Sequence, residues 1–264
     1  MHREFEPPIA LRDTIKCFWY NRTSLEETPT GFEVVPDGFA EIIFHFGGSC
    51  SIEVNGALEL LPSPFLMGLL GHPAHFYGQN CLEIIAVRCY PWAVPDLLAL
   101  PSGNGIQVFE HPVAGLHALL AHCVANDGIE DAITHLQNYF LAAPIQPGAN
   151  ALLYKAGSAM TKSNGTLPVS HVARAAHATV RTLERKFKAS LGHTVKDVSA
   201  LMRFEQARNR LWHEPGVNIA ALAHELGYAD QSHLSREFKK YSGTTPAAFA
   251  RKAKNRGKGS TPSL

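Results

Sequence analysis

The chain has 264 residues, of which 45% are apolar, and its formal net charge at neutral pH is +1. This length exceeds the usual size of one domain and the apolar content is ample for buried cores, so we expect two domains. No run of about 18 apolar residues occurs, which argues against a membrane-spanning helix, and the stretch MHREFEPPIA lacks the apolar core of a signal peptide.

The first hundred residues have the pattern of short β-strands. The segments FEVVPDGFAEIIFHFGGSCSIEVNG (Phe32–Gly56) and CLEIIAVRCY (Cys81–Tyr90) contain apolar and β-branched runs, broken at Pro-Asp-Gly and Gly-Gly. Several short strands with turn signals between them predict a barrel or a sandwich. Phe44 and Phe46 alternate with His45, so only one of these two sets faces inward.

From Val113 onward the apolar residues recur at helical spacing. The segments VAGLHALLAHCVAND and IEDAITHLQNYFLA, within residues 113–142, are separated by Asn126-Asp127-Gly128. They predict two amphipathic helices that present an apolar stripe. This stripe packs either on the protein's own strands or on a second copy of the chain, and the sequence leaves both options open.

The charge divides near the proline-containing stretch AAPIQPGAN (Ala142–Asn150). Residues 1–148 contain 5 Lys and Arg against 16 Asp and Glu, a net charge of −11, and residues 149–264 contain the other 19 against 7, a net charge of +12. This division suggests that the C-terminal half meets a polyanion, although mutual attraction of the two halves is an alternative. We expect domains at residues 1–145 (β-rich over 1–110) and 150–254, followed by a disordered tail at 255–264.

The C-terminal half has helical spacing throughout and contains an internal repeat. LERKFKASLGHTVKDV (Leu183–Val198) aligns with LSREFKKYSGTTPAAF (Leu234–Phe249) at a constant offset of 51 residues. In each copy a short helix, at residues 169–176 or 219–226, precedes a tight turn and a longer helix. This is the order of a helix-turn-helix unit. The preceding segments VARAAHAT and LAHELGYAD also match if the second copy has one extra residue in its turn.

Each longer helix has an apolar face and a polar face. The apolar stripes, expected to pack on the preceding helix, are Leu183, Phe187 and Leu191 in the first copy and Leu234, Phe238 and Tyr241 in the second. Thr179 and Asp230 stand at N-cap positions. Polar and Arg side chains in the first two turns suit base edges in a major groove: Arg181, Glu184, Arg185, Gln231, Ser232, Ser235 and Arg236. Four further residues suit phosphates: Thr179, Lys188, Lys239 and Lys240.

An ordinary solvated helix face is the alternative interpretation of any single charged helix. Two such faces, in register and in the basic half, favour double-stranded DNA as the partner. Thr194 and Asp197 predict a capping box, and the amphipathic pattern continues to about Trp212, before Pro215-Gly216. A helix of about 19 residues is about 28 Å long. Such a linker helix is near the ~34 Å that separates successive major grooves.

These units resemble the DNA-binding domain of the AraC/XylS family of bacterial transcription regulators. The resemblance lies in GYADQSHLSREFKKYSGTTPAAF (Gly227–Phe249) and VRTLERKFKASLGHT (Val180–Thr194), and extends over roughly residues 167–252. It implies base contacts by Arg181, Glu184 and Arg185 in the first unit and by Gln231, Ser232 and Arg236 in the second. His177 stands where the family usually has glycine. Histidine tolerates a left-handed backbone better than most non-glycine residues.

The N-terminal part is similar to the sensor domains of some family members, in FEVVPDGFAEIIFHFG and IIAVRCYPWAV. This similarity implies a cupin-like β-barrel followed by helices used for dimerisation, and a small-molecule effector of unspecified identity. Family membership also implies contact with RNA polymerase in an activator. The expected fold is therefore α+β: a cupin-like barrel with a helical extension, then an all-α domain of two helix-turn-helix units joined by a linker helix.

Several side chains of the β-rich part are candidates for an effector pocket: Trp19, Glu41, His45, Arg88 and Tyr90. Arg88 would pair with an anionic effector, because a guanidinium and a carboxylate form a bidentate ion pair. His72 and His75, near Cys81, Glu83 and Cys89, are weak metal-ligand candidates, since their spacing fits no standard site. We expect no cofactor.

The sequence contains no P-loop, G-x-S-x-G, H-E-x-x-H or dinucleotide-binding motif, so we expect no enzymatic activity. Its five cysteines show no paired spacing, which indicates reduced thiols in a cytoplasmic protein. We therefore expect an effector-controlled, sequence-specific transcription regulator. The alternatives are a cupin-type metalloenzyme fused to a DNA-binding module, and a non-specific architectural DNA-binding protein.

Overall fold

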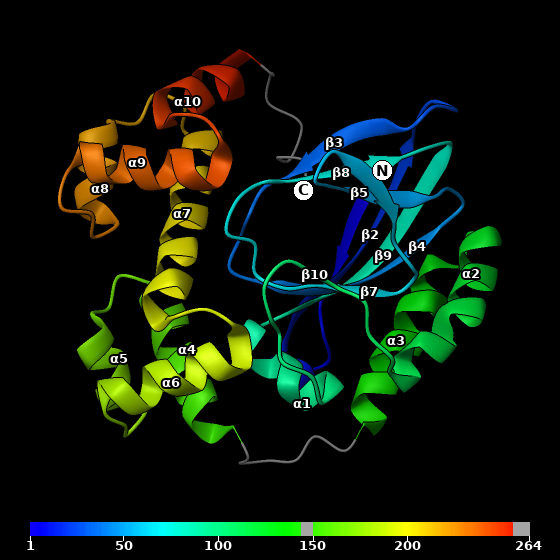
Figure 1. The fold of residues 1–264 in the computed structure, drawn as a ribbon, viewed down its shortest axis with the longest axis horizontal. Coiled ribbons are helices and arrows are strands. Elements are labelled where there is room, and N and C mark those ends of the chain that lie inside the picture. Colours follow the sequence, from blue (N-terminus) through cyan, green and yellow to red (C-terminus); the bar gives the residue numbers. More distant parts are fainter. Residues whose placement is uncertain (144–149, 256–264) are drawn as a thin grey trace.

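Two antiparallel sheets, which we call the β domain, form the first part of the fold (Figure 1). The computed structural model describes residues 1–143 and 150–255. In spatial order the larger sheet contains β1 (His2–Phe5), β2 (Ile15–Ser24), β9 (Cys81–Cys89), β4 (Ala40–Phe46), β7 (Phe65–Met67) and β10 (Ile106–Gln107). The smaller sheet contains β3 (Thr30–Val34), β8 (Ala74–Gly78), β5 (Cys50–Val54) and β6 (Ala57–Leu60).

Successive side chains along β2, β4 and β9 point to opposite faces of the larger sheet and pack in two separate hydrophobic cores. On one face, Trp19, Ile43 and Ile84 pack with Phe65 and Phe76 in a cluster that includes residues from both sheets. The opposite face of the same strands carries another buried set, including Phe18, Phe44, Phe46 and Ile85. Both faces of β2, β4 and β9 are therefore buried, as expected for strands covered on two sides.

Helices α2 (His117–Ala125) and α3 (Ile129–Ala142) cover the outer face of the larger sheet, together with the short helix α1 (Val94–Leu98). Leu120, Ile133, Leu136 and Phe140 are buried in the same cluster as Phe44. The sequence left open whether the apolar stripe of these helices packs on the protein's own strands or on a second copy. In the structure it packs on the β domain of the same chain. Phe44 and Phe46 face these helices, whereas His45 points to the other side of the sheet.

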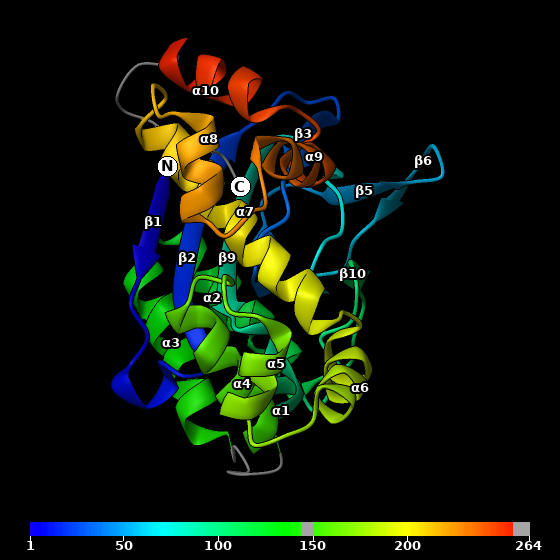
Figure 2. The same ribbon diagram turned by 90° about the vertical axis from the view of Figure 1, so that its left-hand side faces the viewer.

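The C-terminal helices, which we call the helical domain, lie beside the β domain (Figure 1). They are α4 (Ala151–Lys162), α5 (Val169–Ala175), α6 (Val180–Leu191), α7 (Val195–His213), α8 (Ile219–Glu225), α9 (Gln231–Ser242) and α10 (Pro246–Asn255). Figure 2 shows α7 running between α6 at one end and α8, α9 and α10 at the other. Their shared core contains Leu183, Phe187, Phe204 and Phe238, and also Trp92 from the β domain.

The predicted disordered tail was placed one residue too early. Asn255 lies in the last turn of α10, because the helical pattern that follows the N-terminal Pro246 continues through Lys254. The rest of that predicted tail, residues 256–264, lies outside the described residues, as does most of the predicted domain junction at 144–149.

Two expectations from the sequence concern its cysteines and membrane-spanning helices. All five cysteines are free, and burial raises the pKa of the Cys17 and Cys50 thiols to about 12. Thiols with such a high pKa are poor nucleophiles, which is the property of inert core residues. Over residues 1–143 and 150–255, no helix combines the length and the apolar character needed to cross a bilayer.

Candidate DNA interface and ligand cavity

Both helix-turn-helix units make their turn with one left-handed residue. In the first unit this residue is His177, with φ of 53°, and in the second it is Gly227, with φ of 73°. The following N–H closes the turn in each case: Ala178 donates to the Ala173 carbonyl and Tyr228 to the Ala223 carbonyl, both at 2.9 Å. His177 thus adopts the left-handed backbone that histidine tolerates better than most non-glycine residues.

The longer helix of each unit begins with a side-chain cap. Thr179 Oγ1 accepts from the Thr182 N–H at 3.1 Å, and Asp230 Oδ1 accepts from the His233 N–H at 2.7 Å. The latter bond holds the pKa of Asp230 below its ordinary value. Gly192 and Gly243 end the two helices in the left-handed conformation, with φ of 72° and 69°. Matching caps at both ends make α6 and α9 local copies of one another.

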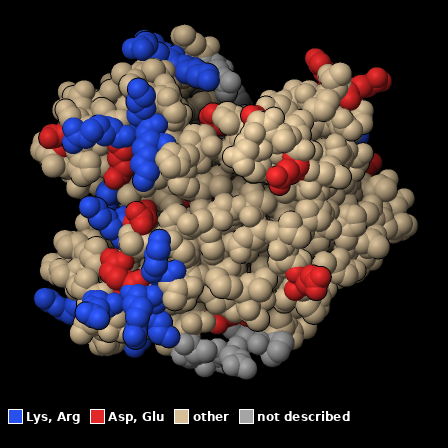
Figure 3. Space-filling view, in the orientation of Figure 1, with Lys and Arg blue, Asp and Glu red and all other residues tan. Residues whose placement is uncertain are grey.

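The predicted apolar stripes are buried and leave the polar faces outward. Leu183, Phe187, Leu191, Leu234 and Phe238 are all 0% exposed. Most predicted DNA-contacting residues are exposed: Thr179, Arg181, Arg185, Lys188, Gln231, Ser232, Arg236, Lys239 and Lys240. Figure 3 shows Lys and Arg side chains gathered along the side of the molecule formed by the helical domain, with few on the β domain in this view.

Besides Thr179, which caps α6, three of the predicted contacts have local partners. Glu184 is half-buried, and its Oε2 accepts from the Val195 N–H at 3.1 Å, which holds the carboxylate at the start of α7. Lys188 Nζ donates to the Gly192 carbonyl at 2.7 Å. Lys240 Nζ lies 4.8 Å from the centroid of the Tyr241 ring. The two lysines remain exposed, so a phosphate can replace these partners without opening the core.

The linker helix α7 has the predicted length of 19 residues and the predicted capping box. Thr194 Oγ1 accepts from the Asp197 N–H at 3.1 Å, and the Thr194 N–H donates to Asp197 Oδ2 at 3.0 Å. Arg203, which the sequence did not single out, connects α7 to its neighbours. Its Nη1 donates to the Gly165 carbonyl at 2.9 Å and its Nη2 lies 3.4 Å from Glu237 Oε1 on α9.

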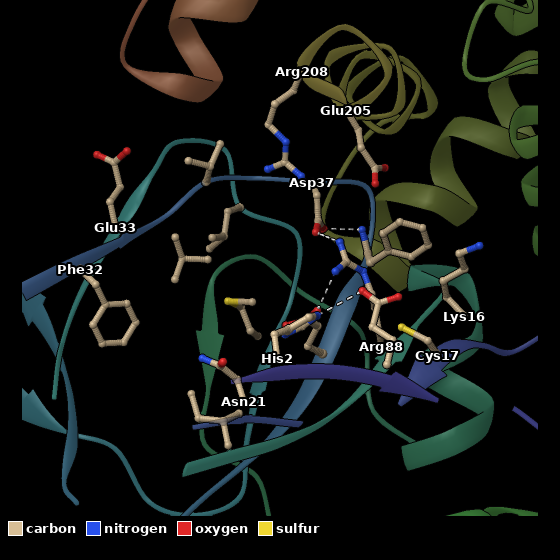
Figure 4. Close-up of a pocket in the computed structure, with 18 of the residues that line it drawn as sticks. His2, Lys16, Cys17, Asn21, Phe32, Glu33, Asp37, Arg88, Glu205 and Arg208 are labelled. Carbon is tan, nitrogen blue, oxygen red and sulfur yellow. Dashed lines mark hydrogen bonds and ion pairs between the residues drawn. The ribbon is translucent and has the colours of Figure 1, made fainter. Parts of the chain in front are cut away.

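A cavity of about 570 Å³ lies between the β domain and α7 (Figure 4). Residues of β2, β3, β4 and β9 line it, and Glu205, Arg208 and Asn209 of α7 close one side. Figure 4 shows Glu205 and Arg208 reaching from the helix toward Asp37 and Arg88. Both domains therefore contribute side chains to one cavity.

Arg88 is at the centre of the polar part of this cavity. Its guanidinium forms an ion pair with Asp37 and lies 3.5 Å from Glu41 Oε1. Trp19 Nε1 donates to the same Glu41 oxygen at 3.1 Å, and the Phe39 ring centroid lies 4.7 Å from the Arg88 guanidinium carbon. Arg88 is thus already paired with two carboxylates, which leaves it poorly available to the anionic effector that the sequence suggested.

Burial raises the pKa of two carboxyl groups around Arg88. Glu41 is 2% exposed, and its pKa rises from 4.5 to about 7 because desolvation outweighs the attraction of Arg88. The pKa of Glu205 is also raised, first by desolvation and then by Asp37. Burial alone lowers the pKa of Arg88, but Asp37 and Glu41 outweigh it and raise that pKa. One permanent cation is therefore surrounded by more carboxylate than it neutralises.

The structure brings only some of the predicted pocket residues together. Glu41 and Arg88 line the cavity, and Trp19 supports Glu41 from behind. His45 Nε2 instead lies 3.2 Å from the Leu61 carbonyl, and Tyr90 stacks on Trp92 at 5.2 Å, so neither lines this cavity. Asp37, Glu205 and Arg208 were missed, since Asp37 looked like a turn residue and the other two looked like the solvated face of a linker helix.

The weak metal candidates are not assembled into a site. His72 and His75 are both exposed. Within the described ranges, no group of three or more His, Cys, Asp or Glu side chains is arranged to hold a metal ion.

Two family models match this chain, one in each domain. Residues 172–252 match a helix-turn-helix domain, and residues 3–104 match a domain of unknown function, DUF6597. Among curated proteins, the transcriptional regulator RipA of Corynebacterium diphtheriae is 33% identical over 82 residues, which are 31% of this chain and 24% of RipA. RipA of Corynebacterium glutamicum is 35% identical over 69 residues, or 20% of its length. The chain thus matches a quarter or less of these relatives.

Among solved structures, ToxT of Vibrio cholerae has a TM-score of 0.47 and 11% identity, over 89% of this chain and 98% of ToxT. The helix-turn-helix match includes both repeat units, and the RipA relatives are themselves regulators of that type. The helix-turn-helix and RipA matches agree with the duplicated turn, caps and apolar stripes of α5–α6 and α8–α9. Residues 172–252 of this chain are therefore a helix-turn-helix domain of the type found in AraC-family transcription regulators.

Proposed function

We propose that this protein is a sequence-specific DNA-binding transcription regulator, controlled by a small molecule bound in the cavity between the β domain and α7. The observation that carries the DNA-binding part is the pair of identically capped helices, α6 and α9, with exposed Arg and polar residues on one face. Both lie in the basic half of the chain. Two reading helices at the ends of a capped 19-residue helix suit two major-groove segments of double-stranded DNA.

The exposed residues divide by position along α6 and α9. In the first two turns, Arg181, Arg185, Gln231, Ser232 and Arg236 are the base-reading residues, with the half-buried Ser235 beside them. Thr179, Lys188, Lys239 and Lys240 contact phosphates. Glu184 reads a base only by giving up its bond to the Val195 N–H.

The proposed role as a DNA-binding regulator also implies where the protein acts and which proteins it contacts. Reading DNA in a bacterium places the protein in the cytoplasm, and an activator of this type contacts RNA polymerase. We place the domain boundaries at residues 1–145 and 150–254, because most residues of each buried cluster fall within one of these ranges; Leu69 and Trp92, which pack in the helical cluster, are the exceptions. A homodimer through α2 and α3 would use their outer faces, where Leu119 and Leu141 are 39% and 46% exposed.

The cavity supports control by a ligand because its walls come from both domains. A ligand that binds one arrangement of α7 against the β domain better than another shifts the population toward that arrangement. The coupling between the ligand and DNA is then reciprocal. A cupin-type metalloenzyme receives less support, since the exposed His72 and His75 have no partner set for a metal in the described ranges.

The DNA-binding proposal is tested at Arg236. The preferred site is first selected from random duplexes with the purified protein, and binding is then measured for that site and for scrambled DNA. We expect Arg236→Ala to weaken the selected site by about 1–3 kcal/mol and scrambled DNA little. Arg251→Ala, an exposed arginine of α10, is the control. Equal losses on both duplexes would instead favour non-specific architectural binding.

A further inference from the structure

The chemistry of the cavity lining indicates which class of small molecule it accepts, an inference that rests on the proposed ligand control. Its charged lining residues are five carboxylates and three cations: Glu4, Glu33, Asp37, Glu41 and Glu205, against Lys16, Arg88 and Arg208. With all of them ionised, the lining carries two net negative charges, and with Glu41 protonated it still carries one. An incoming anion therefore meets a repulsive cavity, and an incoming cation meets an attractive one.

The arrangement around Arg88 strengthens this argument. Asp37 and Glu41 already occupy the guanidinium, so an anionic ligand would have to displace a buried carboxylate from its ion pair. Removing the partner of a buried charge is strongly unfavourable. Lys16 and Arg208 are included in the count of lining charges, and both reduce the pKa rise of Glu205 without abolishing it.

Glu41 supplies a specific acceptor for a cationic donor. Its side chain is almost fully buried, yet it lines the cavity. Trp19 and Arg88 both approach Oε1, and among the described residues no hydrogen bond is made to Oε2. A carboxylate accepts hydrogen bonds on both oxygens, and a carboxylate that lines a cavity favours a charged donor.

The remaining lining combines a few polar side chains, His2, Asn21, Thr23 and Asn209, with an apolar wall. Leu25, Phe32, Val34, Leu70 and Ile84 form the part of the wall supplied by the strands and the loops next to them. Such a surface binds the apolar body of a ligand, while a few polar groups fix its orientation. Phe32 and Phe39 add aromatic faces to this lining.

We propose that the cavity binds an organic cation: an ammonium or amidinium head at the carboxylates of Asp37, Glu41 and Glu205, and an aromatic or aliphatic body against the apolar wall. A head group at Glu205 contacts α7 directly, so the ligand joins the helix that carries both DNA-binding units to the β domain.

The test compares three molecules with the same aromatic body and different heads: benzylammonium, benzyl alcohol and benzoate. Their binding to the full-length protein is measured by isothermal titration calorimetry at neutral pH. We expect benzylammonium to bind about tenfold or more tightly than benzoate, with benzyl alcohol between them. Glu205→Gln should weaken benzylammonium severalfold and leave benzyl alcohol unchanged. Glu59→Gln, on the exposed β6 strand outside the cavity, is the matched control.

A preference for benzoate, equal binding of the three molecules, or no binding of any of them at millimolar concentration overturns the proposal. Circular dichroism of Glu205→Gln shows whether the variant is folded, and the three-molecule comparison on the unmodified protein does not depend on that variant. Failure of the DNA-binding proposal is seen separately, as equal affinity of the ligand-free protein for selected and scrambled duplexes.

Discussion

The two helix-turn-helix units share their local geometry but differ in how the rest of the molecule holds them. The first unit is fixed to the β domain: the Ser102 N–H donates to the Ser190 carbonyl at 2.9 Å, and His193 Nε2 lies 3.3 Å from the Leu69 carbonyl. In the described residues, no hydrogen bond or ion pair joins α8, α9 or α10 to the β domain or to α1, α2 and α3. The second unit is held instead by α7, through the Arg203–Glu237 ion pair and the apolar core that the C-terminal helices share.

The repeated sequence therefore determines the local structure of each unit, but it does not determine how firmly each unit is attached to the rest of the molecule. We expect the first unit to move with the β domain, because the hydrogen bonds at Ser190 and His193 join only this unit to it. The second unit follows α7, which lines the cavity through Glu205 and contacts α9 through Arg203. If the proposed ligand binds in the cavity, we expect it to act chiefly on the position of α9 relative to α6.

The largest effect is expected from Trp92→Ala. Trp92 is 3% exposed, and its indole packs so closely on α4 that a Cβ at Gly157 would lie 2.2 Å from it. Its removal leaves a cavity between the β domain and the first unit, at a cost of about 3–5 kcal/mol of unfolding free energy. Urea denaturation measures this loss. The control is Trp212→Ala, at a half-buried tryptophan near Phe249 of α10, with an expected loss of about 1–2 kcal/mol. Equal losses contradict the anchoring role of Trp92.

Gly192 and Gly243, which end α6 and α9, allow the attachment of the two units to be compared at equivalent positions. A Cβ at Gly192 would lie 2.5 Å from Asn104 Oδ1 of the β domain, whereas a Cβ at Gly243 would meet nothing within 4 Å. Each Gly→Ala substitution strains a left-handed residue, at about 1–2 kcal/mol. Gly192→Ala also pushes the Asn104 loop away, so we expect it to cost about 1 kcal/mol more.

Thermal or urea unfolding of both alanine variants measures that difference. The Asn104→Gly background should remove it, because the obstructing side chain is then absent. If the two variants lose the same stability in both backgrounds, the β domain does not hold the end of α6 in solution.

The helical domain was largely predictable because its signals are local. The 51-residue repeat, the caps at Thr179 and Asp230, and the Thr194–Asp197 capping box each act within a few residues of chain. The cavity was not predictable in the same way. Asp37 and Glu41 are close in the sequence, but Arg88 and Glu205 are far from them, and Glu205 reaches them only because α7 packs across the end of the β domain. Arg88 was recognised, but its neutralisation by Asp37 depends on a contact over 51 positions.

A smaller effect is expected from Glu41→Gln, and it depends on pH. The groups that face Glu41 are Glu4 of β1, Cys17 and Trp19 of β2, Arg88 of β9 and Asp37 of the loop before β4. Because its folded-state pKa of about 7 exceeds its ordinary value of 4.5, Glu41 binds a proton more strongly in the folded state. The stability from this proton is present below the ordinary pKa and is lost as the pH rises through 7.

Glutamine does not titrate, so wild type should lose stability relative to Glu41→Gln between pH 4.5 and pH 7. Urea denaturation over this range measures the difference. Glu59→Gln, at an exposed position on β6, should give a curve parallel to that of wild type. A wild-type curve that rises relative to Glu41→Gln across the window means that Arg88 outweighs burial at this carboxyl.

The smallest effect is expected at the left-handed residue of the first turn. His177 is exposed and has φ of 53°, where a side chain costs backbone energy that glycine avoids. His177→Gly relieves this cost but frees the unfolded chain, so the net gain should be below about 1 kcal/mol. At the equivalent position of the second unit, Gly227→Ala adds a side chain to a left-handed residue. A Cβ there meets only Thr166 at an ordinary 3.5 Å, so backbone strain alone should destabilise this unit by about 1 kcal/mol. Thermal unfolding measures both changes in stability. A gain for His177→Gly and a loss for Gly227→Ala show that both turns use the same backbone conformation. A loss for both variants means that the His177 side chain stabilises the first turn.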